Sequence, residues 1–241
     1  MPGLKPATEK QRQAFQFYGR RKGRPLRKGR QFLFDELLPR ITIPLTKGPL
    51  NEGGALDPAT LFAPRQRAVW LEIGFGGGEH LAHQAASNPD IGFLGCEVFE
   101  SGIASGLSHI AERDLENVRL HPEDARVLLA ALQPRSLDRV FLLFPDPWPK
   151  RRHAQRRFVN RGNLDRLAEL IVAGGELRIA SDDPVYIEWT LQHVPVHPAF
   201  QWLAQGPADW LQRPEDAIET RYEKKAREAG RVPHYFRFRR R

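Results

Sequence analysis

The segment with the most distinctive chemistry is Phe144–Lys150, whose sequence is Phe-Pro-Asp-Pro-Trp-Pro-Lys. Its three prolines stiffen the backbone and hold a carboxylate, Asp146, and an indole, Trp148, in fixed places. An indole can stack on a nucleic-acid base, and the Lys and Arg residues that follow can bind phosphates. The segment therefore favours a loop that binds nucleic acid beside a reactive site. A rigid surface turn with a packed Trp is the alternative, but it leaves the adjoining cations without a role.

A glycine-rich turn, Glu72–Gly78, forms a second candidate site. Glycines such as Gly74 and Gly76 let the backbone approach a ligand closely, as in nucleotide-binding folds. A dinucleotide site would require a small residue in place of Glu79, because a carboxylate there repels the pyrophosphate. S-adenosylmethionine carries no phosphate and has an ammonium group that carboxylates can bind. The turn therefore favours this cofactor over NAD.

Two further carboxylates follow apolar runs. Glu97 ends one run, where an acid can bind the ribose hydroxyls of an adenosine ligand. Asp124 follows the next run and can accept a hydrogen bond from the adenine amino group or cap a helix. Taken alone, Asp124 leaves these two roles equally open, and its register with the other acids favours the ligand role. We therefore predict a cofactor site that contains Glu72, Gly74, Gly76, Glu97 and Asp124.

These candidate residues lie between apolar runs that alternate with helical segments. Near-continuous apolar strands in this order predict a parallel sheet covered by helices on both faces, with ligands bound at the carboxyl ends of the strands. After His193 the alternation stops. The predicted strands are Ala68–Ile73, Ile91–Val98, Asn117–His121, Arg139–Phe144, Gly175–Ala180 and, at the end, Tyr235–Arg239. The predicted helices are Gln31–Leu38, Gly78–Ala86, Ser101–Arg113, Ala125–Leu132, Leu164–Val172 and Pro184–Gln192.

The charge distribution divides the chain into an acidic body and three basic segments. The 241 residues have a net charge of +8, yet residues 1–30 carry +9, 145–161 carry +5 and 221–241 carry +7, which leaves −13 for the rest. Such a distribution is typical of a surface that binds a polyanion, and solvated tails are the alternative. We assign 1–67 to a basic arm and irregular extension, in part disordered without nucleic acid, and 68–241 to one α/β domain.

Several classes of protein and site are disfavoured. The single Cys96 excludes a disulfide framework and, inside an apolar strand, is expected to behave as a small hydrophobe and not as a nucleophile. Pro195 separates His193 from His197, so this pair is not expected to bind zinc. No apolar run approaches the ~18 residues of a membrane span, and the N-terminus lacks the apolar region of a secretory signal. We therefore predict a cytoplasmic protein without metal or membrane partner.

The sequence resembles the bacterial tRNA (guanine-N7)-methyltransferases, the TrmB family, over residues 68–241. The proline–aspartate–proline–tryptophan loop with its basic tail is specific to that family, whereas the glycine-rich turn is not. Arg221 and Tyr222 stand where the family usually shows Lys and Phe. The matching stretches are Glu72–Gly78, Gly95–Val98, Asp124-Ala125, Phe144–His153 with Arg156-Arg157, Ala180–Asp182 and Thr220–Glu223.

The resemblance implies a Rossmann-like class I methyltransferase fold with a mostly parallel seven-stranded sheet and helices on both faces. It implies transfer of a methyl group from S-adenosyl-L-methionine to N7 of guanine 46 in the variable loop of tRNA, by a monomer or a homodimer. It also implies that Asp146 is the catalytic residue and lines the cofactor site together with Glu72, Glu97 and Asp124. The implied substrate contacts are Lys150, Asp182, Thr220, Arg221, Tyr222 and Glu223.

The implied reaction requires little acid–base catalysis from the enzyme. Guanine N7 has an in-plane lone pair and no proton, so its methylation needs alignment and desolvation and no general base. Asp146 then acts as a hydrogen-bond acceptor and counter-charge, and Trp148 as a stacking platform. The alternatives are a class I methyltransferase acting on another RNA base nitrogen and a non-catalytic RNA-binding module. An NAD-dependent oxidoreductase ranks last because of Glu79 and the basic segments.

Overall fold

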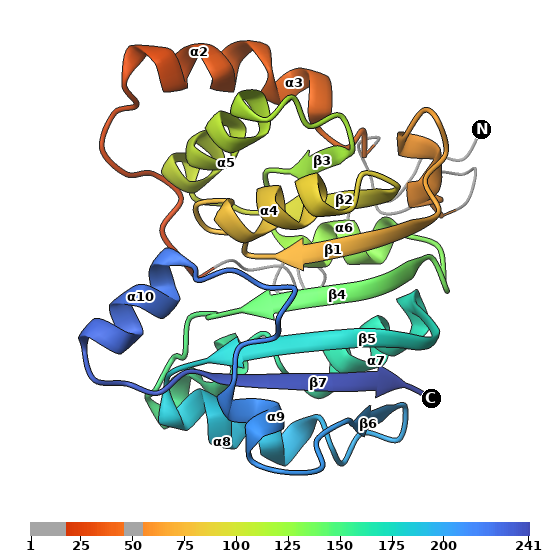
Figure 1. The fold of residues 1–241 in the computed structure, drawn as a ribbon, viewed down its shortest axis with the longest axis vertical. Coiled ribbons are helices and arrows are strands. Elements are labelled where there is room, and N and C mark those ends of the chain that lie inside the picture. Colours follow the sequence, from red (N-terminus) through yellow and green to blue (C-terminus); the bar gives the residue numbers. More distant parts are fainter. Residues whose placement is uncertain (1–17, 46–54) are drawn as a thin grey trace, which may run out of the picture.

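Seven strands form one sheet in the order β3-β2-β1-β4-β5-β7-β6 (Figure 1). The computed structural model describes residues 18–45 and 55–241. Strands β1 to β5 are parallel, and β7 lies antiparallel between β5 and β6. The predicted α/β fold with a mostly parallel seven-stranded sheet is therefore confirmed. The strands are β1 (Ala68–Ile73), β2 (Ile91–Cys96), β3 (Val118–His121), β4 (Leu137–Leu143), β5 (Ile171–Ser181), β6 (Phe200–Trp202) and β7 (His234–Arg240).

Helices cover both faces of the sheet, as the apolar strands require. Helices α4 (Glu79–Ser87) and α5 (Glu100–Glu112) bury apolar side chains in one core cluster with β2 and β3. Helices α6 (Ala125–Ala131), α7 (Arg161–Leu170) and α8 (Pro184–His193) contribute to a second cluster on the opposite face. The order of strands and helices brings the carboxyl ends of β1, β2, β3 and β4 to one edge, where the predicted site residues lie.

The described part of the N-terminal extension packs against this domain. Helices α2 (Lys28–Glu36) and α3 (Leu38–Ile41) occupy the region of the predicted helix, and α2 lies along α5. The backbone N–H of Ile43 donates to the Leu120 carbonyl and so covers the edge strand β3. Disorder was predicted for part of residues 1–67, of which residues 1–17 and 46–54 lie outside the described residues. The division of the chain at residue 67 therefore stays a prediction.

The remaining elements are short. One of them precedes β1 and the others lie in the connections that follow β4 and β6, and none of them was predicted from the sequence. No helix within residues 18–45 and 55–241 is long and apolar enough to cross a membrane. These elements are the 3-10 helices η1 (Pro58–Leu61) and η2 (Arg151–Arg156) and the helices α9 (Ala208–Leu211) and α10 (Arg221–Glu228).

Candidate active site

A cleft of about 390 Å³ opens at the carboxyl ends of the parallel strands. This volume falls within the range of small-molecule sites, and the position is where open α/β sheets bind ligands. The structure brings together there most of the residues predicted for the cofactor site and one predicted for the substrate. These residues are Gly74, Gly76, Glu97, Asp124, Asp146 and Tyr222.

The glycine-rich turn forms one wall of this cleft. Gly74 and Gly76 have φ angles of +71° and +56°, and Gly78 has +81°, a region that residues with a side chain rarely adopt. A methyl group built on Gly78 would lie 2.6 Å from the Cα atom of Gly106 in α5. Glycine is therefore required at this position both by the backbone conformation and by the close approach of α5.

Glu97 holds the turn in place from the end of β2. One carboxylate oxygen accepts from the backbone N–H of Gly76 at 2.8 Å. The other accepts from the N–H groups of Val98 and Phe99 at 2.7 and 2.9 Å. Burial raises the pKa of Glu97 despite these three bonds. A carboxylate has about four lone-pair positions, so Glu97 keeps capacity for a ribose hydroxyl at the cleft surface.

Asp124 combines the two roles that the sequence left open. Its side chain accepts from the backbone N–H of Arg126 at 2.9 Å and so caps α6. It also forms an ion pair with the Arg126 guanidinium at 2.6 Å, and both side chains line the cleft. The cap is therefore present, and the adenine contact stays a prediction.

Glu72 points away from the cleft. Its carboxylate is 4% exposed and lies 2.8 Å from Nδ1 of His80, near the start of α4. Ile73, the next residue of β1, faces the cleft instead, because neighbouring side chains of a strand alternate between faces. The described residues that line the cleft do not include Glu72. Its contact with the cofactor thus stays a prediction, and its visible role is to connect β1 with α4.

The loop after β4 is strained and firmly held. Phe144 and Trp148 have φ angles of +49° and +43°, which cost free energy in residues other than glycine and persist where the surroundings enforce them. The buried Arg157 donates to the carbonyls of Pro147 and Trp148 at 3.1 and 3.0 Å. Asp146 lies between the strained residues Phe144 and Trp148 in the sequence. Its side chain lines the cleft, where desolvation raises its pKa.

Trp148 is packed among cationic and aromatic groups. The Arg156 guanidinium lies 4.9 Å from the Trp148 ring and 4.5 Å from the ring of Tyr18, distances typical of cation–π contacts. His153 approaches the same indole edge-on at 5.8 Å, and Tyr18 does so at 6.4 Å. Tyr18 and the adjoining Gly19 and Arg20 line the cleft. The charge of this segment predicts a basic arm and does not indicate its place at the cleft.

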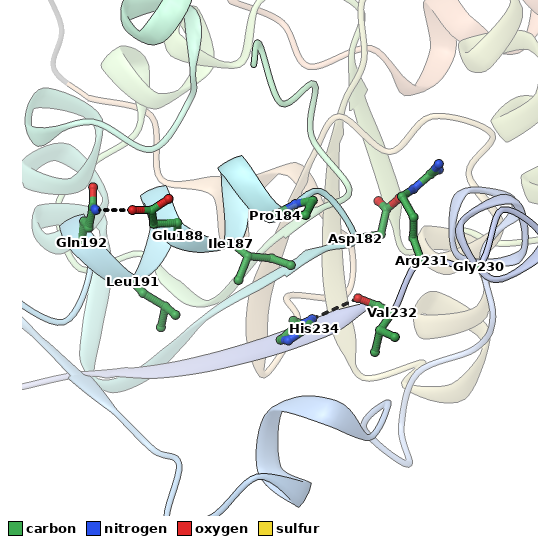
Figure 2. A pocket seen from close by; sticks show the side chains of 10 residues that line it. All are labelled: Asp182, Pro184, Ile187, Glu188, Leu191, Gln192, Gly230, Arg231, Val232 and His234. Carbon is green, nitrogen blue, oxygen red and sulfur yellow. Dashed lines mark hydrogen bonds and ion pairs between the residues drawn. The ribbon is translucent and has the colours of Figure 1, made fainter. Parts of the chain in front are cut away.

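Of the six predicted substrate residues, only Tyr222 is among the described residues that line this cleft. Lys150 is exposed at the start of η2, beside the exposed Arg151 and Arg152. Asp182 follows β5 and lines a separate cavity of about 690 Å³ between α8 and the segment before β7. Figure 2 shows its ion pair with Arg231 at one end of this cavity and Leu191 of α8 farther along. Their contacts with substrate stay predictions.

The other four predicted substrate residues form the first turn of α10. Thr220 Oγ1 accepts from the backbone N–H of Glu223 at 3.2 Å and caps the helix. Glu223 is 1% exposed and pairs with Arg213 at 3.2 Å. This Thr-x-x-Glu pattern is typical of a capping box and would have predicted the helix from the sequence.

Arg221 and Tyr222 reach the glycine-rich turn. The Arg221 guanidinium pairs with Glu79 and donates to Ser105 at 3.1 Å. A methyl group on Gly77 would collide with Arg221, and one on Gly76 would lie 2.7 Å from the Tyr222 ring. The start of α10 therefore packs on the glycine-rich turn, and Tyr222 forms part of the cleft wall.

Cys96 lies at the base of the cleft but has no nucleophilic character. It is 1% exposed in β2, and burial raises the pKa of its thiol well above the usual range. A thiol that stays protonated at neutral pH does not attack a base. Within the described part of the chain, no group of three His, Cys, Asp or Glu residues is arranged to hold a metal ion. His193 instead stacks on Trp189, and His197 pairs with Asp165 at 3.0 Å.

Comparisons with known proteins agree with the geometry. A family model described as a putative methyltransferase matches residues 66–235. The tRNA (guanine-N(7)-)-methyltransferase of Rhodospirillum rubrum is 56% identical, covering 97% of this chain and 91% of its own. The enzyme of that name from Paramagnetospirillum magneticum is 52% identical, covering 93% and 92%.

Solved structures share the fold at low sequence identity. The 16S rRNA methyltransferase KamB superposes with a TM-score of 0.52 and 15% identity, covering 74% of this chain and 90% of that one. An antibiotic-related methyltransferase gives a TM-score of 0.51 and 16% identity, covering 80% and 97%.

The fold and the cleft together define a class I S-adenosylmethionine-dependent methyltransferase. Within that class, the chain belongs to the tRNA (guanine-N7)-methyltransferase family.

Proposed function

We propose that this chain transfers the methyl group of S-adenosylmethionine to N7 of guanine 46 in the variable loop of tRNA. The observation that carries the proposal is the meeting of two segments in one cleft. The turn held by Glu97 lies there with the strained loop that presents Asp146 and Trp148. The relatives named for guanine-N7 methylation, at 56% and 52% identity, support the same choice of atom.

The cleft suits this cofactor chemically. When bound, S-adenosylmethionine supplies an electrophilic methyl group on a positively charged sulfur. Glu97 would hold the ribose hydroxyls and Asp124 the adenine amino group, while the backbone at Gly74 and Gly76 allows close approach. The carboxylates of Glu97 and Asp146 also make the cleft favourable for a ligand with a cationic sulfur and an ammonium group.

The base requires positioning more than proton transfer. Because N7 carries no proton, Asp146 acts in its ionised form as hydrogen-bond acceptor and counter-charge for the methylated base. The packed surroundings of Trp148 fix its ring, so that it can hold the guanine by stacking without a large loss of side-chain freedom. Alignment of this kind supplies on the order of 7–11 kcal/mol in well-oriented reactions.

The tRNA backbone would be bound by the exposed cations next to the loop. Lys150, Arg151 and Arg152 are exposed at the start of η2. The same 3-10 helix ends at Arg156, which lines the cleft. We expect a cytoplasmic enzyme that works as a monomer or a homodimer on tRNA, without a metal ion or a membrane partner. Asp182 and the first turn of α10 would add contacts on the substrate side.

The decisive experiment is incubation of the purified protein with unmodified tRNA transcript and methyl-labelled S-adenosylmethionine, followed by nuclease digestion and mass spectrometry. The expected product is N7-methylguanosine at position 46. A transcript with adenine at that position is the matched control and should take up no label. Label on another base nitrogen would identify a different RNA methyltransferase, and cofactor-independent tRNA binding without transfer would indicate a binding module.

A further inference from the structure

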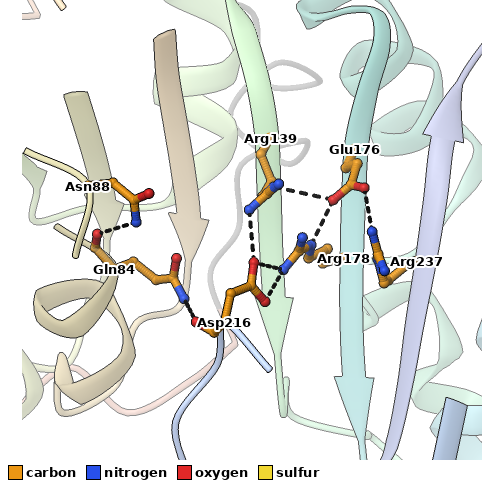
Figure 3. Close-up of polar contacts among 7 residues, drawn as sticks. All are labelled: Gln84, Asn88, Arg139, Glu176, Arg178, Asp216 and Arg237. Atoms are coloured by element: carbon orange, nitrogen blue, oxygen red, sulfur yellow. Dashed lines mark hydrogen bonds and ion pairs between the residues drawn. The ribbon is translucent and has the colours of Figure 1, made fainter. Parts of the chain in front are cut away.

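A cluster of ionic groups lies on the face of the sheet that also carries α4 (Figure 3). Three guanidinium groups from neighbouring strands surround two carboxylates, and we call these five residues the arginine cluster. Arg178 binds Glu176 and Asp216, each at 2.8 Å. Arg139 lies 3.3 Å from both carboxylates, and Arg237 lies 2.9 Å from Glu176.

Four of the five groups belong to the sheet, whereas Asp216 belongs to the loop 212–220. Arg139 is on β4, Glu176 and Arg178 are on β5, and Arg237 is on β7. The Asp216 side chain is 46% exposed, and the Arg178 side chain with which it pairs is 8% exposed. The backbone carbonyl of Asp216 accepts from the side chain of Gln84 in α4. The loop is thus fastened at one residue to both the sheet and α4.

The guanidinium groups lower the pKa values of both carboxylates in the arginine cluster. Burial opposes the charge on Glu176, but Arg178 and Arg237 outweigh it and lower its pKa to about 2. Burial likewise opposes the charge on Asp216, and Arg178 and Arg139 outweigh it, so that its pKa is also lowered. Removal of the Asp216 charge would leave a buried guanidinium with a partner missing, which is strongly unfavourable.

The loop 212–220 leads directly into α10, whose first turn forms part of the wall of the cofactor cleft. Tyr222 packs against Gly76 and lines the cleft, and Arg221 pairs with Glu79 at the end of the glycine-rich turn. The space between the loop and the sheet encloses only about 30 Å³, so the loop lies directly on the strands. A displacement of Asp216 would therefore be passed along a short, closely packed segment to Tyr222.

We propose that Asp216 is a positioning residue, which holds Tyr222 against the glycine-rich turn by fastening the loop 212–220 to the arginine cluster. Tyr222 then forms a fixed wall of the cofactor cleft. The inference rests on the proposed function, because it assigns this cleft to S-adenosylmethionine. The ionic groups on the sheet would thereby contribute to cofactor binding without contacting the cofactor.

The test compares Asp216→Asn with the wild type and with Arg237→Gln. Asn keeps the shape of Asp and loses its charge, whereas Arg237→Gln removes an ion pair from the same cluster without touching the loop. We expect Asp216→Asn to raise the Kd of S-adenosylmethionine about five- to tenfold, which is less than the full effect of a lost charge-assisted hydrogen bond, because Asp216 acts on the cofactor only through Tyr222. Arg237→Gln should leave it within twofold, and Asp216→Glu should restore most of the affinity. Isothermal titration calorimetry measures each Kd, and circular dichroism verifies that each variant is folded.

A double-mutant cycle distinguishes positioning from general destabilisation. If Asp216 acts through Tyr222, Asp216→Asn should have little further effect in a Tyr222→Ala background, so the two changes should be clearly less than additive. Additive effects, or an equal loss in Arg237→Gln, would overturn the inference while leaving the proposed function intact. A wild-type protein that binds no S-adenosylmethionine would overturn both.

Discussion

Replacement of Glu97 by Gln tests the cofactor site most directly. The carboxylate accepts three backbone N–H groups, from Gly76 through one oxygen and from Val98 and Phe99 through the other. Gln has a single acceptor oxygen, so its NH2 group must face at least one of these donors. Loss of one hydrogen bond to a charged acceptor costs about 1.5–3 kcal/mol, and the ribose contact that we assign to Glu97 is of the same kind.

The expected result is therefore a Kd for S-adenosylmethionine raised about ten- to hundredfold, since 1.4 kcal/mol corresponds to a factor of ten. Affinity for tRNA should change no more than a few-fold, because Glu97 faces the cofactor. Titration calorimetry gives the first value, and filter binding with labelled tRNA gives the second. Glu100→Gln is the matched control, since Glu100 pairs with Lys22 at the surface and should leave both affinities unchanged.

The pH dependence adds a second readout to this experiment. Burial raises the pKa of Glu97, so in the wild type cofactor affinity should decrease as the pH falls through that pKa, whereas Glu97→Gln should keep only the weaker dependence that Asp146 contributes. An unchanged Kd in the variant would refute the assignment. Equal losses of cofactor and tRNA affinity, with a large drop in Tm, would show that the substitution disrupts the fold and that the reasoning about a separate cofactor site is wrong.

The remaining predictions concern the base, the tRNA and the thiol. The single-turnover rate with saturating tRNA should be nearly flat from about pH 6 to 8.5 and fall at lower pH, because the raised pKa of Asp146 makes it take up a proton earlier than an ordinary carboxyl. Asp146→Asn should lower the whole plateau, and a rate that climbs about tenfold per pH unit between about pH 6 and 8.5 would contradict methylation at N7. Changing Lys150, Arg151 and Arg152 together to Ala should reduce the slope of log Kd for tRNA against log salt by about two to three, and an unchanged slope would show that they bind no phosphate. Cys96→Ala should keep most of the activity in a methyl-transfer assay, whereas complete loss in a folded, cofactor-binding variant would indicate covalent chemistry.

The sheet was predictable because its strands are continuous apolar runs. The predicted Ala68–Ile73 coincides with β1, and the other four parallel strands and β7 were found with shifts of a few residues at their ends. The edge strand β6 has three residues, too few for a pattern to stand out. Helix α10 was not predicted because charged residues dominate it, although Thr220 and Glu223 fit the Thr-x-x-Glu sequence pattern of a capping box and Thr220 caps the helix.

The site was predictable as a set of residue types but not as a set of contacts. Glu97 and Asp146 line the cleft as expected, whereas Glu72 faces His80 in the interior. Arg156 and Arg157 are adjacent cations in different environments, since Arg157 is buried beneath the loop. Such differences depend on which side chain is buried by tertiary packing, and a local sequence pattern does not indicate this. The contact of Tyr18 with Trp148 likewise joins segments far apart in the sequence.

The neighbours of the glycine-rich turn determine how this chain can vary among organisms. At Gly78 the obstacle to a side chain is the backbone of Gly106, which no substitution elsewhere can remove. At Gly77 the obstacle is the Arg221 side chain, which a shorter residue would clear. Variants should therefore keep glycine at position 78, whereas a side chain at position 77 requires a shorter residue at position 221.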